Sequence, residues 1–269
     1  MMSNIKLLAL DLDGTVVNHD LSISAPLQSA LSHLINQTDV KVVVATGRMH
    51  PSAMIYANKI GVTTPVVSYQ GGMICDIDAS ETRLYHEPIP LETAKSVVEF
   101  LQSDGFSTNI YIDNKLYTNH DNPHATLYAK LSGIEPDRVD CLLTRLTDGP
   151  TKMMTIDDHR MDALIEGLNE HFGSELTVLR SRSNFCEMIS PKASKWNAVQ
   201  FLAKQWSIDA HEVMACGDQG NDVSMIQAAG VGVAMGNAPD DVKQHADFIT
   251  RSIEDDGVLH AIETFILKN

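Results

Sequence analysis

Short apolar runs that stop at polar or glycine-containing motifs restrict the fold of this chain more than any other feature. Ile5–Leu10 carries a single lysine and ends at Asp11, and Lys41–Arg48 and Glu212–Asp218 follow the same plan. Apolar residues at consecutive positions indicate strands that are buried on both faces, and such strands belong to parallel sheets. The runs therefore predict a parallel sheet that helices cover on both sides.

Helical patterns fill the segments between these runs. Ser24 followed by Pro26 marks one helix start, and Gly61 marks the end of a helix that begins at about Pro51. Further helices and strands continue the alternation. They are the helices Lys195–Trp206, Asp222–Ala229, Asp240–His245 and Gly257–Leu267 and the strands Pro65–Gly72, Val231–Gly236 and Asp247–Thr250. This order predicts an α/β fold with a doubly wound, Rossmann-like parallel sheet.

The middle of the chain has a different pattern, in which apolar and polar residues alternate. Asn109–Asn119 indicates a hairpin around the two-residue turn Asn114-Lys115, and Leu176–Ser190 indicates two more antiparallel strands. Helices are expected at Glu92–Ser103 and Asp158–Phe172. We therefore predict an inserted α+β cap domain at residues 85–188, between two core segments at residues 1–84 and 189–269.

Composition and charge restrict the partners and the location of the protein. The 269-residue chain is 43% hydrophobic, as expected of a globular protein, and its formal net charge is −15. Because such a surface repels phosphate backbones, neither nucleic acid nor a membrane is expected as a partner. No apolar run approaches the ~20 residues of a membrane span, and the N-terminus does not resemble a signal peptide. The cysteine spacing fits neither a metal site nor a disulfide framework, which favours reduced thiols and a cytoplasmic location.

Four motifs contain candidate catalytic or binding residues, and they follow the predicted core strands or open a helix. They are Asp11-Leu12-Asp13-Gly14-Thr15, Thr46-Gly47-Arg48, Lys195, and Gly217-Asp218-Gln219-Gly220-Asn221-Asp222. Each has a structural alternative, because such residues also make turns, cap helices or lie on solvated faces. The carboxyl ends of parallel strands meet at one edge of a sheet, so we expect the motifs to share one site. Their carboxylate oxygens suit Mg²⁺, and their hydroxyl and N–H groups suit a phosphate.

In this order, the motifs resemble those of the haloacid dehalogenase (HAD) superfamily, whose members are mostly phosphatases. The resemblance is to the Cof-type, sugar-phosphatase-like branch, which has an α+β cap between the second and third motifs. Arg48 and Lys195 are far enough apart in the sequence to hold a cap of about a hundred residues, whereas the segment from Asp13 to Thr46 holds one helix and one strand. The pattern covers nearly the whole chain.

The resemblance implies hydrolysis of small phosphate monoesters through an aspartyl-phosphate intermediate. Asp11 is then the nucleophile, and Asp13 protonates the leaving oxygen and later deprotonates the attacking water. Mg²⁺ would be held by the Asp11 carboxylate, the Asp13 backbone carbonyl and Asp218. The groups expected to bind the substrate phosphate are Thr46, the N–H groups of Leu12 and Gly47, Lys195 and Asn221. Arg48 and Asp222 are expected to support the site, and Asp222 is expected to orient Lys195 or a water rather than to bind the metal.

Two other functions fit part of the pattern. A phosphomutase returns the phosphoryl group to its substrate instead of to water, and free phosphate release distinguishes the two reactions. A phospho-binding regulatory protein also combines aspartates, a threonine and a lysine on a parallel sheet, but it needs neither Asp13 nor a cap. A dehalogenase is disfavoured because it needs no second acidic residue at Asp13 and no metal.

The sequence defines the substrate only as a small phosphorylated metabolite, and it favours a monomer slightly. Five residues are candidates for the cleft wall, although for each of them a structural or solvated role is favoured. They are Arg48, His50, Asn114, Arg182 and Glu187. Relatives often carry Asn-Gly-Ala where this chain has Gln70-Gly71-Gly72, and Gly where it has Trp196. These two departures concern the cleft wall and a helix start. We expect the core to carry the chemical residues and the cap to select the substrate.

Overall fold

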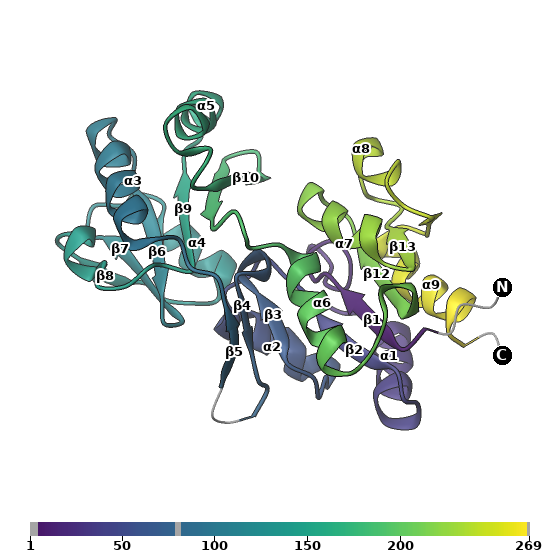
Figure 1. Ribbon diagram of the computed structural model, residues 1–269. Coiled ribbons are helices and arrows are strands. Elements are labelled where there is room, and N and C mark those ends of the chain that lie inside the picture. The colour runs from purple at the N-terminus through teal and green to yellow at the C-terminus, as the bar shows by residue number, and fades with distance from the viewer. Residues whose placement is uncertain (1–4, 79–81, 268–269) are drawn as a thin grey trace.

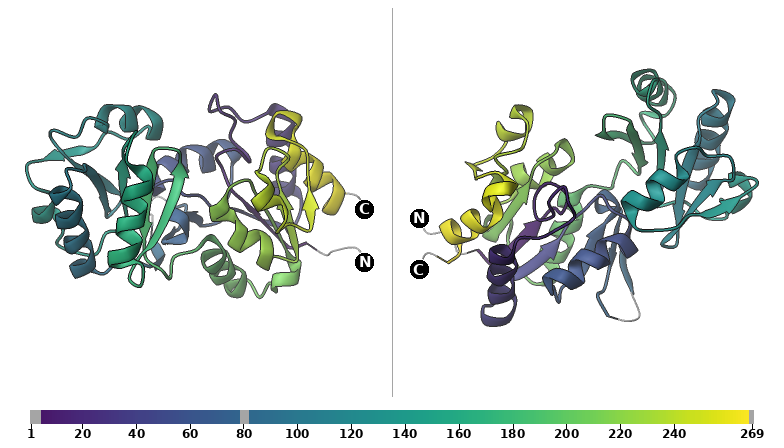
Figure 2. Two further views of the ribbon diagram at one scale, coloured as in Figure 1. Left: turned by 90° about the horizontal axis from the view of Figure 1, so that it is seen from above. Right: turned by 180° about the vertical axis from the view of Figure 1, so that it is seen from behind.

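The computed structural model describes residues 5–78 and 82–267, so the predicted outer ends of the core, residues 1 and 269, lie outside the described residues. Figure 1 shows two sheet-containing units, which we call the core and the cap. The core contains a parallel sheet, and the cap contains a six-stranded sheet. The first and last described segments of the chain both belong to the core (Figures 1 and 2).

The core sheet has five parallel strands in the order β14-β13-β12-β1-β2. They are β1 (Leu7–Leu10), β2 (Lys41–Val44), β12 (Val213–Gly217), β13 (Val231–Ala234) and β14 (Phe248–Ile249). A parallel bridge between Ala45 and Val67 adds β3 (Val66–Ser68) beside β2. Successive strands are added on one side of β1 as far as β3 and on its other side from β12 to β14, so the strand order reverses between β1 and β12, as in a doubly wound sheet. The predicted α/β fold with a doubly wound core is confirmed.

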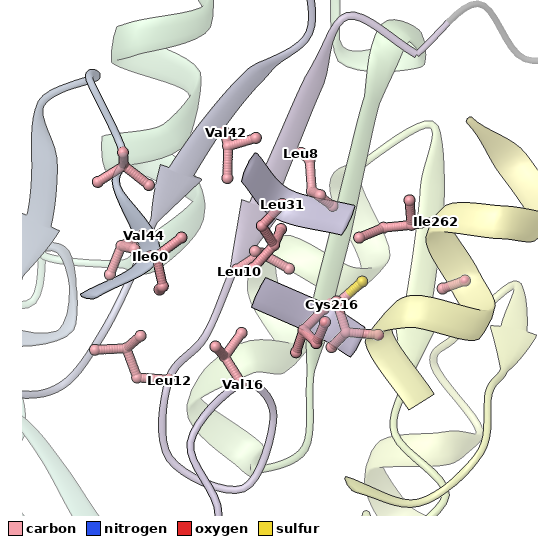
Figure 3. Close-up of a cluster of buried hydrophobic side chains, with 14 of the residues drawn as sticks. Leu8, Leu10, Leu12, Val16, Leu31, Val42, Val44, Ile60, Cys216 and Ile262 are labelled. Carbon is pink, nitrogen blue, oxygen red and sulfur yellow. The ribbon is translucent and has the colours of Figure 1, made fainter. Parts of the chain in front are cut away.

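Helices cover both faces of the core sheet because the side chains of β1 alternate between two hydrophobic clusters. Leu8 and Leu10 pack with Leu31 of one helix and Ile262 of another (Figure 3). Leu7 on the opposite face packs in a second cluster. The core helices are α1 (Ala25–Gln37), α2 (His50–Ile60), α6 (Lys195–Gln205), α7 (Val223–Ala228), α8 (Asp240–Lys243) and α9 (Gly257–Phe265). Each fully buried leucine contributes about 1.5–3 kcal/mol relative to an exposed one.

The cap sheet has the strand order β10-β11-β9-β6-β7-β8 and is antiparallel except for the pair β7–β8. Its strands are β6 (Thr108–Ile112), β7 (Lys115–Asn119), β8 (Asp137–Val139), β9 (Lys152–Ile156), β10 (Thr177–Arg182) and β11 (Phe185–Ile189). The cap helices are α3 (Leu91–Ser103), α4 (Ala125–Ser132) and α5 (Met161–Phe172). The predicted α+β character of the insertion is confirmed.

The two faces of the cap sheet have different partners. Met153 on one face packs with residues of α3 and α5. The neighbouring residue Met154 points to the opposite face, where it joins a cluster with Tyr69 and Met73 of the core. The cap is therefore attached to the core through the same sheet face that carries Met154.

A three-stranded antiparallel sheet connects the core to the cap. It consists of β3, β4 (Met73–Cys75) and β5 (Arg83–His86) in that order. Tyr85, where the cap was expected to begin, lies in β5 and pairs with Ile74 of β4, and Met188, where it was expected to end, lies in β11. Short 3₁₀ turns lie at Tyr69–Gly71, Leu142–Arg145, Ala210–Glu212, Gly220–Asp222 and Ile253–Asp255.

Several predicted boundaries were wrong, each for a local reason. The hairpin turn is Asp113-Asn114 rather than Asn114-Lys115, because these two residues tolerate the positive φ values of 49° and 59° that the turn requires. The strand predicted to reach Gly72 ends at Ser68, where the chain turns with positive φ at Tyr69 and Gln70.

Within the described residues, no helix is both long and apolar enough to cross a membrane.

Candidate active site

The loops that follow β1 and β12 form the centre of the candidate site. These parallel strands are neighbours in the sheet, with Leu10 opposite Cys216, and successive strands are added in opposite directions on either side of the pair. Asp11 follows β1 directly, and its N–H donates to the Cys216 carbonyl at 3.1 Å. Asp218 follows β12 in the same way. Two carboxylates distant in sequence are thus placed at the crevice where doubly wound sheets bind ligands.

Lys195 lies between two carboxylates in the interior of the protein. It begins α6 after the N-cap Ser194, and its Nζ atom lies 2.6 Å from Asp11 Oδ1 and 2.6 Å from Asp222 Oδ1. Its side chain is 0% exposed, so it is not a solvated surface lysine. Burial alone lowers the pKa of an amine, but the Asp11 and Asp222 carboxylates outweigh it and raise the pKa of Lys195. The lysine is therefore a fixed positive charge.

Asp222 uses both carboxylate oxygens within the protein. Oδ1 accepts a hydrogen bond from Lys195, and Oδ2 accepts the backbone N–H groups of Asp218 and Gln219, each at 3.0 Å. The turn is tight, since a Cβ atom on Gly217 would lie 2.4 Å from Asp222 Cβ. Asp222 thus holds both the lysine and the loop that presents Asp218.

Asp218 is held by side chains from both loops. Its Oδ1 accepts from Thr15 Oγ1 at 3.1 Å, and its Oδ2 accepts from Gln219 Nε2 at 3.0 Å. Gly14, with φ of 83°, passes so close that a Cβ atom there would lie 2.3 Å from Asp218 Oδ2. Burial, with a further contribution from Asp222, raises the pKa of Asp218 to about 6.

Asp11 and its acidic neighbours have the chemistry of a cation site. Asp11, Asp218 and Asp222 each offer a carboxylate oxygen, and these atoms all lie within 4.8 Å of one another. Burial raises the pKa of Asp11 well above its usual value, Lys195 opposes the shift, and Asp222 and Asp218 add to it. A divalent cation would relieve this crowding, and carboxylate oxygens are the ligands that hard cations prefer. The described residues therefore fit a metal ion.

Asp13 faces Arg48 at the mouth of the site. Its two carboxylate oxygens accept from Arg48 Nε at 2.8 Å and from Arg48 Nη2 at 2.6 Å. Arg48 also donates to Ser52 Oγ at 3.1 Å and lies over the Tyr56 ring, 4.5 Å from its centroid. Because the two-point contact fixes a guanidinium and a carboxylate in one plane, Arg48 orients the half-exposed Asp13 side chain.

A cavity of about 160 Å³ extends from these residues to the cap. At the core end it is lined by Asp11, Asp13, Gly47 and Asn221. The apolar and aromatic side chains that line it from the cap are Tyr128, Leu131, Met154 and Phe185. The cap also lines the cavity with charged side chains, which are Lys152, Arg180, Arg182 and Glu187.

The predicted site residues differ in their relation to this cavity. Those that line it are Asp11, Asp13, Gly47, Arg48, Arg182, Glu187 and Asn221. Those outside its lining are Leu12, Thr46, His50, Asn114, Lys195, Asp218 and Asp222. Leu12 packs in the core cluster shown in Figure 3, and Asn114 accepts a hydrogen bond from the Tyr69 hydroxyl at 3.2 Å.

Among the lining residues that were not assigned to the site from the sequence, Lys152 and Gln70 are polar and deeply buried. Lys152 opens a cap strand, and no local pattern distinguishes it from a surface lysine. Gln70 was noted only as a departure from the Asn-Gly-Ala of relatives. That departure was the one sequence signal that could have assigned Gln70 to the cavity. Both side chains are at least nine-tenths buried.

A family model of haloacid dehalogenase-like hydrolases matches residues 8–262, which include every residue of the site described above. The chain belongs to the haloacid dehalogenase-like hydrolase family. This HAD-like hydrolase is 32% identical to Phosphatase YwpJ from Bacillus subtilis (strain 168), over 96% of this chain and 99% of the relative. The predicted family and the phosphatase class of hydrolase are confirmed.

Solved structures of relatives have the same fold. A haloacid dehalogenase-like hydrolase from Bacteroides thetaiotaomicron is 30% identical, with a TM-score of 0.87 over 97% of this chain and 99% of that one. The protein TM0651 from Thermotoga maritima is 31% identical, with a TM-score of 0.86 over 97% of each chain. The HAD-like hydrolase therefore resembles these proteins along almost its entire length, including the cap.

Proposed function

We propose that this HAD-like phosphatase requires Mg²⁺ and hydrolyses small phosphate monoesters through a phosphorylated Asp11. The observation that carries the proposal is the Asp11 carboxylate itself, which lines the cavity and is held by Lys195 at 2.6 Å. Asp222 fixes the lysine from its other side. A nucleophile needs such fixed orientation, because reaction requires the attacking atom to lie in line with the bond that breaks.

In the first step, an Asp11 oxygen attacks phosphorus and the bond from phosphorus to the ester oxygen breaks. The leaving oxygen takes its proton from the Asp13 carboxyl group. Asp13 is suited to this role because it lies two residues after Asp11, lines the same cavity and is half-exposed at its mouth. The products of this step are the free alcohol and the aspartyl-phosphate.

In the second step, the Asp13 carboxylate takes a proton from water as the water oxygen attacks phosphorus. The bond from phosphorus to the Asp11 oxygen breaks, inorganic phosphate leaves and Asp11 is restored. Division into two steps replaces the attack of water on an ester with two easier displacements. Both steps need groups that neutralise the phosphate oxygens.

We assign several hydrogen-bond donors to the phosphate oxygens. They are Thr46, the N–H groups of Leu12 and Gly47, Lys195 and Asn221. Gly47 and Asn221 line the cavity, and Lys195 Nζ lies 2.6 Å from Asp11 Oδ1. Fixed donors of this kind stabilise the charge that develops in the transition state without reorganising.

For the metal, we assign the Asp11 carboxylate, the Asp13 carbonyl and Asp218 as ligands. Asp222 is not assigned, because its Oδ1 accepts from the buried Lys195 and its Oδ2 accepts two backbone N–H groups of its own loop. The Asp218 oxygens accept from side chains, Thr15 and Gln219, which can turn aside when a cation binds. When bound, Mg²⁺ would offset repulsion between Asp11 and the phosphate and polarise the phosphoryl group.

We assign the cap, predicted at residues 85–188, to substrate selection. The cavity extends between core and cap, and its cap side combines apolar side chains with Lys152, Arg180, Arg182 and Glu187. This supports a small phosphorylated metabolite as the substrate, with its phosphate at the core end.

The four cysteines are free, which supports a reducing, cytoplasmic setting.

The test is the variant Asp11→Asn. It is expected to lower phosphate release from p-nitrophenyl phosphate by at least about a thousandfold, because the amide cannot form the intermediate. Asp39 is exposed, so Asp39→Asn is a matched control and should leave turnover unchanged. Turnover by Asp11→Asn within tenfold of the parent would refute the assignment. Appearance of a phosphorylated isomer in place of free phosphate would identify a mutase.

A further inference from the structure

The cap contributes a buried ion pair to the cavity. Lys152 lies on β9 and Glu187 on β11, and both side chains belong to the core-facing side of the cap sheet, as do Met154 and Phe185. Lys152 Nζ lies 3.3 Å from Glu187 Oε2, and the side chains are only 2% and 8% exposed. Burying two charges costs several kcal/mol per ion, so this pair needs further partners.

Those further partners are on the core. Lys152 Nζ donates to the Gly47 carbonyl at 3.0 Å, and Glu187 Oε2 accepts from Gln70 Nε2 at 3.1 Å. Gly47 lies in the loop after β2, and Gln70 lies in the turn after β3. The cap pair therefore contacts two separate loops of the core.

Gln70 continues the connection to the loop after β12. Its Oε1 accepts from Asn221 Nδ2 at 2.7 Å. Its own backbone is fixed, with φ of 60° and an N–H that donates to the Thr46 carbonyl at 3.1 Å. The space beside it is full, since a Cβ atom on Gly47 would lie 2.3 Å from Gln70 Nε2.

The side chains of Lys152, Glu187, Gln70 and Asn221, which we call the cap–core chain, thus connect Gly47 to Asn221 through the cap. We propose that Lys152, Glu187 and Gln70 are positioning residues: they fix the Gly47 loop and the Asn221 amide in the orientation that binds phosphate, and they do so only while the cap is docked. This inference rests on the proposed function of Gly47 and Asn221.

Hydrogen-bond stoichiometry supports this role. A side-chain amide has two N–H donors, and the contact with Gln70 uses one of those of Asn221, which leaves the other for a phosphate oxygen. Glu187 is acceptor-only when ionised, so it fixes which end of the Gln70 amide faces Asn221. The charge on the cap therefore determines the orientation of an amide on the core.

Two sets of substitutions break the chain at different points without leaving a buried charge unpaired. Lys152→Met with Glu187→Leu removes both charges and keeps similar volumes, a replacement that folded proteins tolerate. Gln70→Leu removes the central amide. Each is expected to raise the Kd of inorganic phosphate by about fivefold to tenfold, as measured by calorimetry with Mg²⁺. The triple variant should lose no more than about tenfold, because the substitutions act through one path.

Hydrogen exchange provides a readout that does not need phosphate. The N–H groups of Tyr69 and Gln70 donate to the Arg48 and Thr46 carbonyls, so both report on the Gly47 loop. The variants should exchange these amides faster by about tenfold. Thr93→Val is the matched control. It removes a hydrogen bond that lies within the cap, because Thr93 donates to Glu175 at 2.5 Å. It should leave these core amides unchanged.

The outcomes separate this inference from the proposed function. Unchanged phosphate affinity and unchanged exchange in the folded variants would overturn the positioning role, and so would additive losses of about a hundredfold in the triple variant. A parent protein that neither binds nor releases phosphate would instead overturn the proposed function, and the exchange measurement would still decide whether the cap fixes the Gly47 loop.

Discussion

Replacing Lys195 with Met tests how strongly the site depends on one buried cation. Lys195 Nζ lies 2.6 Å from both Asp11 and Asp222, and its side chain is 0% exposed. Methionine keeps most of the volume but leaves Asp11, Asp218 and Asp222 without that positive charge. Removing one member of a buried pair costs about 3–5 kcal/mol, because the remaining charge stays desolvated. This is a large fraction of the 5–15 kcal/mol by which domains are typically stable.

The assay for Lys195→Met is urea unfolding in EDTA, followed by circular dichroism. A loss of about 3–5 kcal/mol also lowers Tm by roughly 10 °C. Lys192→Met is the control, since Lys192 is exposed three residues earlier. Adding Asp222→Asn to Lys195→Met should recover part of the loss, because one uncompensated carboxylate is removed. A free energy of unfolding within about 1 kcal/mol of the parent would refute the reasoning.

Three further outcomes are expected. EDTA should abolish phosphate release and Mg²⁺ should restore it, whereas Ca²⁺ should inhibit because its looser coordination misplaces Asp11; full activity without metal would contradict the cation site. Gly14→Ala should raise the Mg²⁺ concentration for half-maximal activity by about tenfold, since its Cβ would lie 2.3 Å from Asp218 Oδ2; an unchanged requirement would count against Asp218 as a ligand. In the metal-free protein, the raised pKa of Asp218, about 6 against an ordinary 3.8, makes the folded state bind more protons than the unfolded state between these values. Stability should therefore fall as pH rises from 4 to 7, by on the order of 2 kcal/mol, and Asp218→Asn should remove that part of the fall in urea titrations; equal pH dependence in both proteins would exclude it.

The core was predictable because its signals are local. The buried strands β1 and β12 are continuous apolar runs, and Asp11 and Asp218 stand immediately after them. The parallel-sheet rule then places these carboxylates at one edge without any knowledge of long-range contacts. Lys195 was identified by its place among the motifs, but its burial between two carboxylates is a tertiary property.

The cap was less predictable because its signals depend on distant partners. Lys152 resembles a surface lysine until Glu187 and the Gly47 carbonyl are placed beside it. The helix α4 and the strands β8 and β9 were missed, and the pairing of β8 with β7 is parallel although the rest of the cap sheet is antiparallel. The predicted hairpin turn was displaced by one residue, because Asp113 tolerates the positive φ that the turn requires better than Lys115 does.

The strand order of the core has a consequence for how the chain folds as it emerges from the ribosome. β1 is made first, but one of its edges pairs only with β12, which begins at Val213. Throughout synthesis of the cap, which has a hydrophobic cluster of its own, the N-terminal half of the core keeps an unpaired apolar edge. Such edges promote association between nascent chains. A chain that stalls before Val213 is therefore expected to contain a folded cap and an aggregation-prone N-terminal segment.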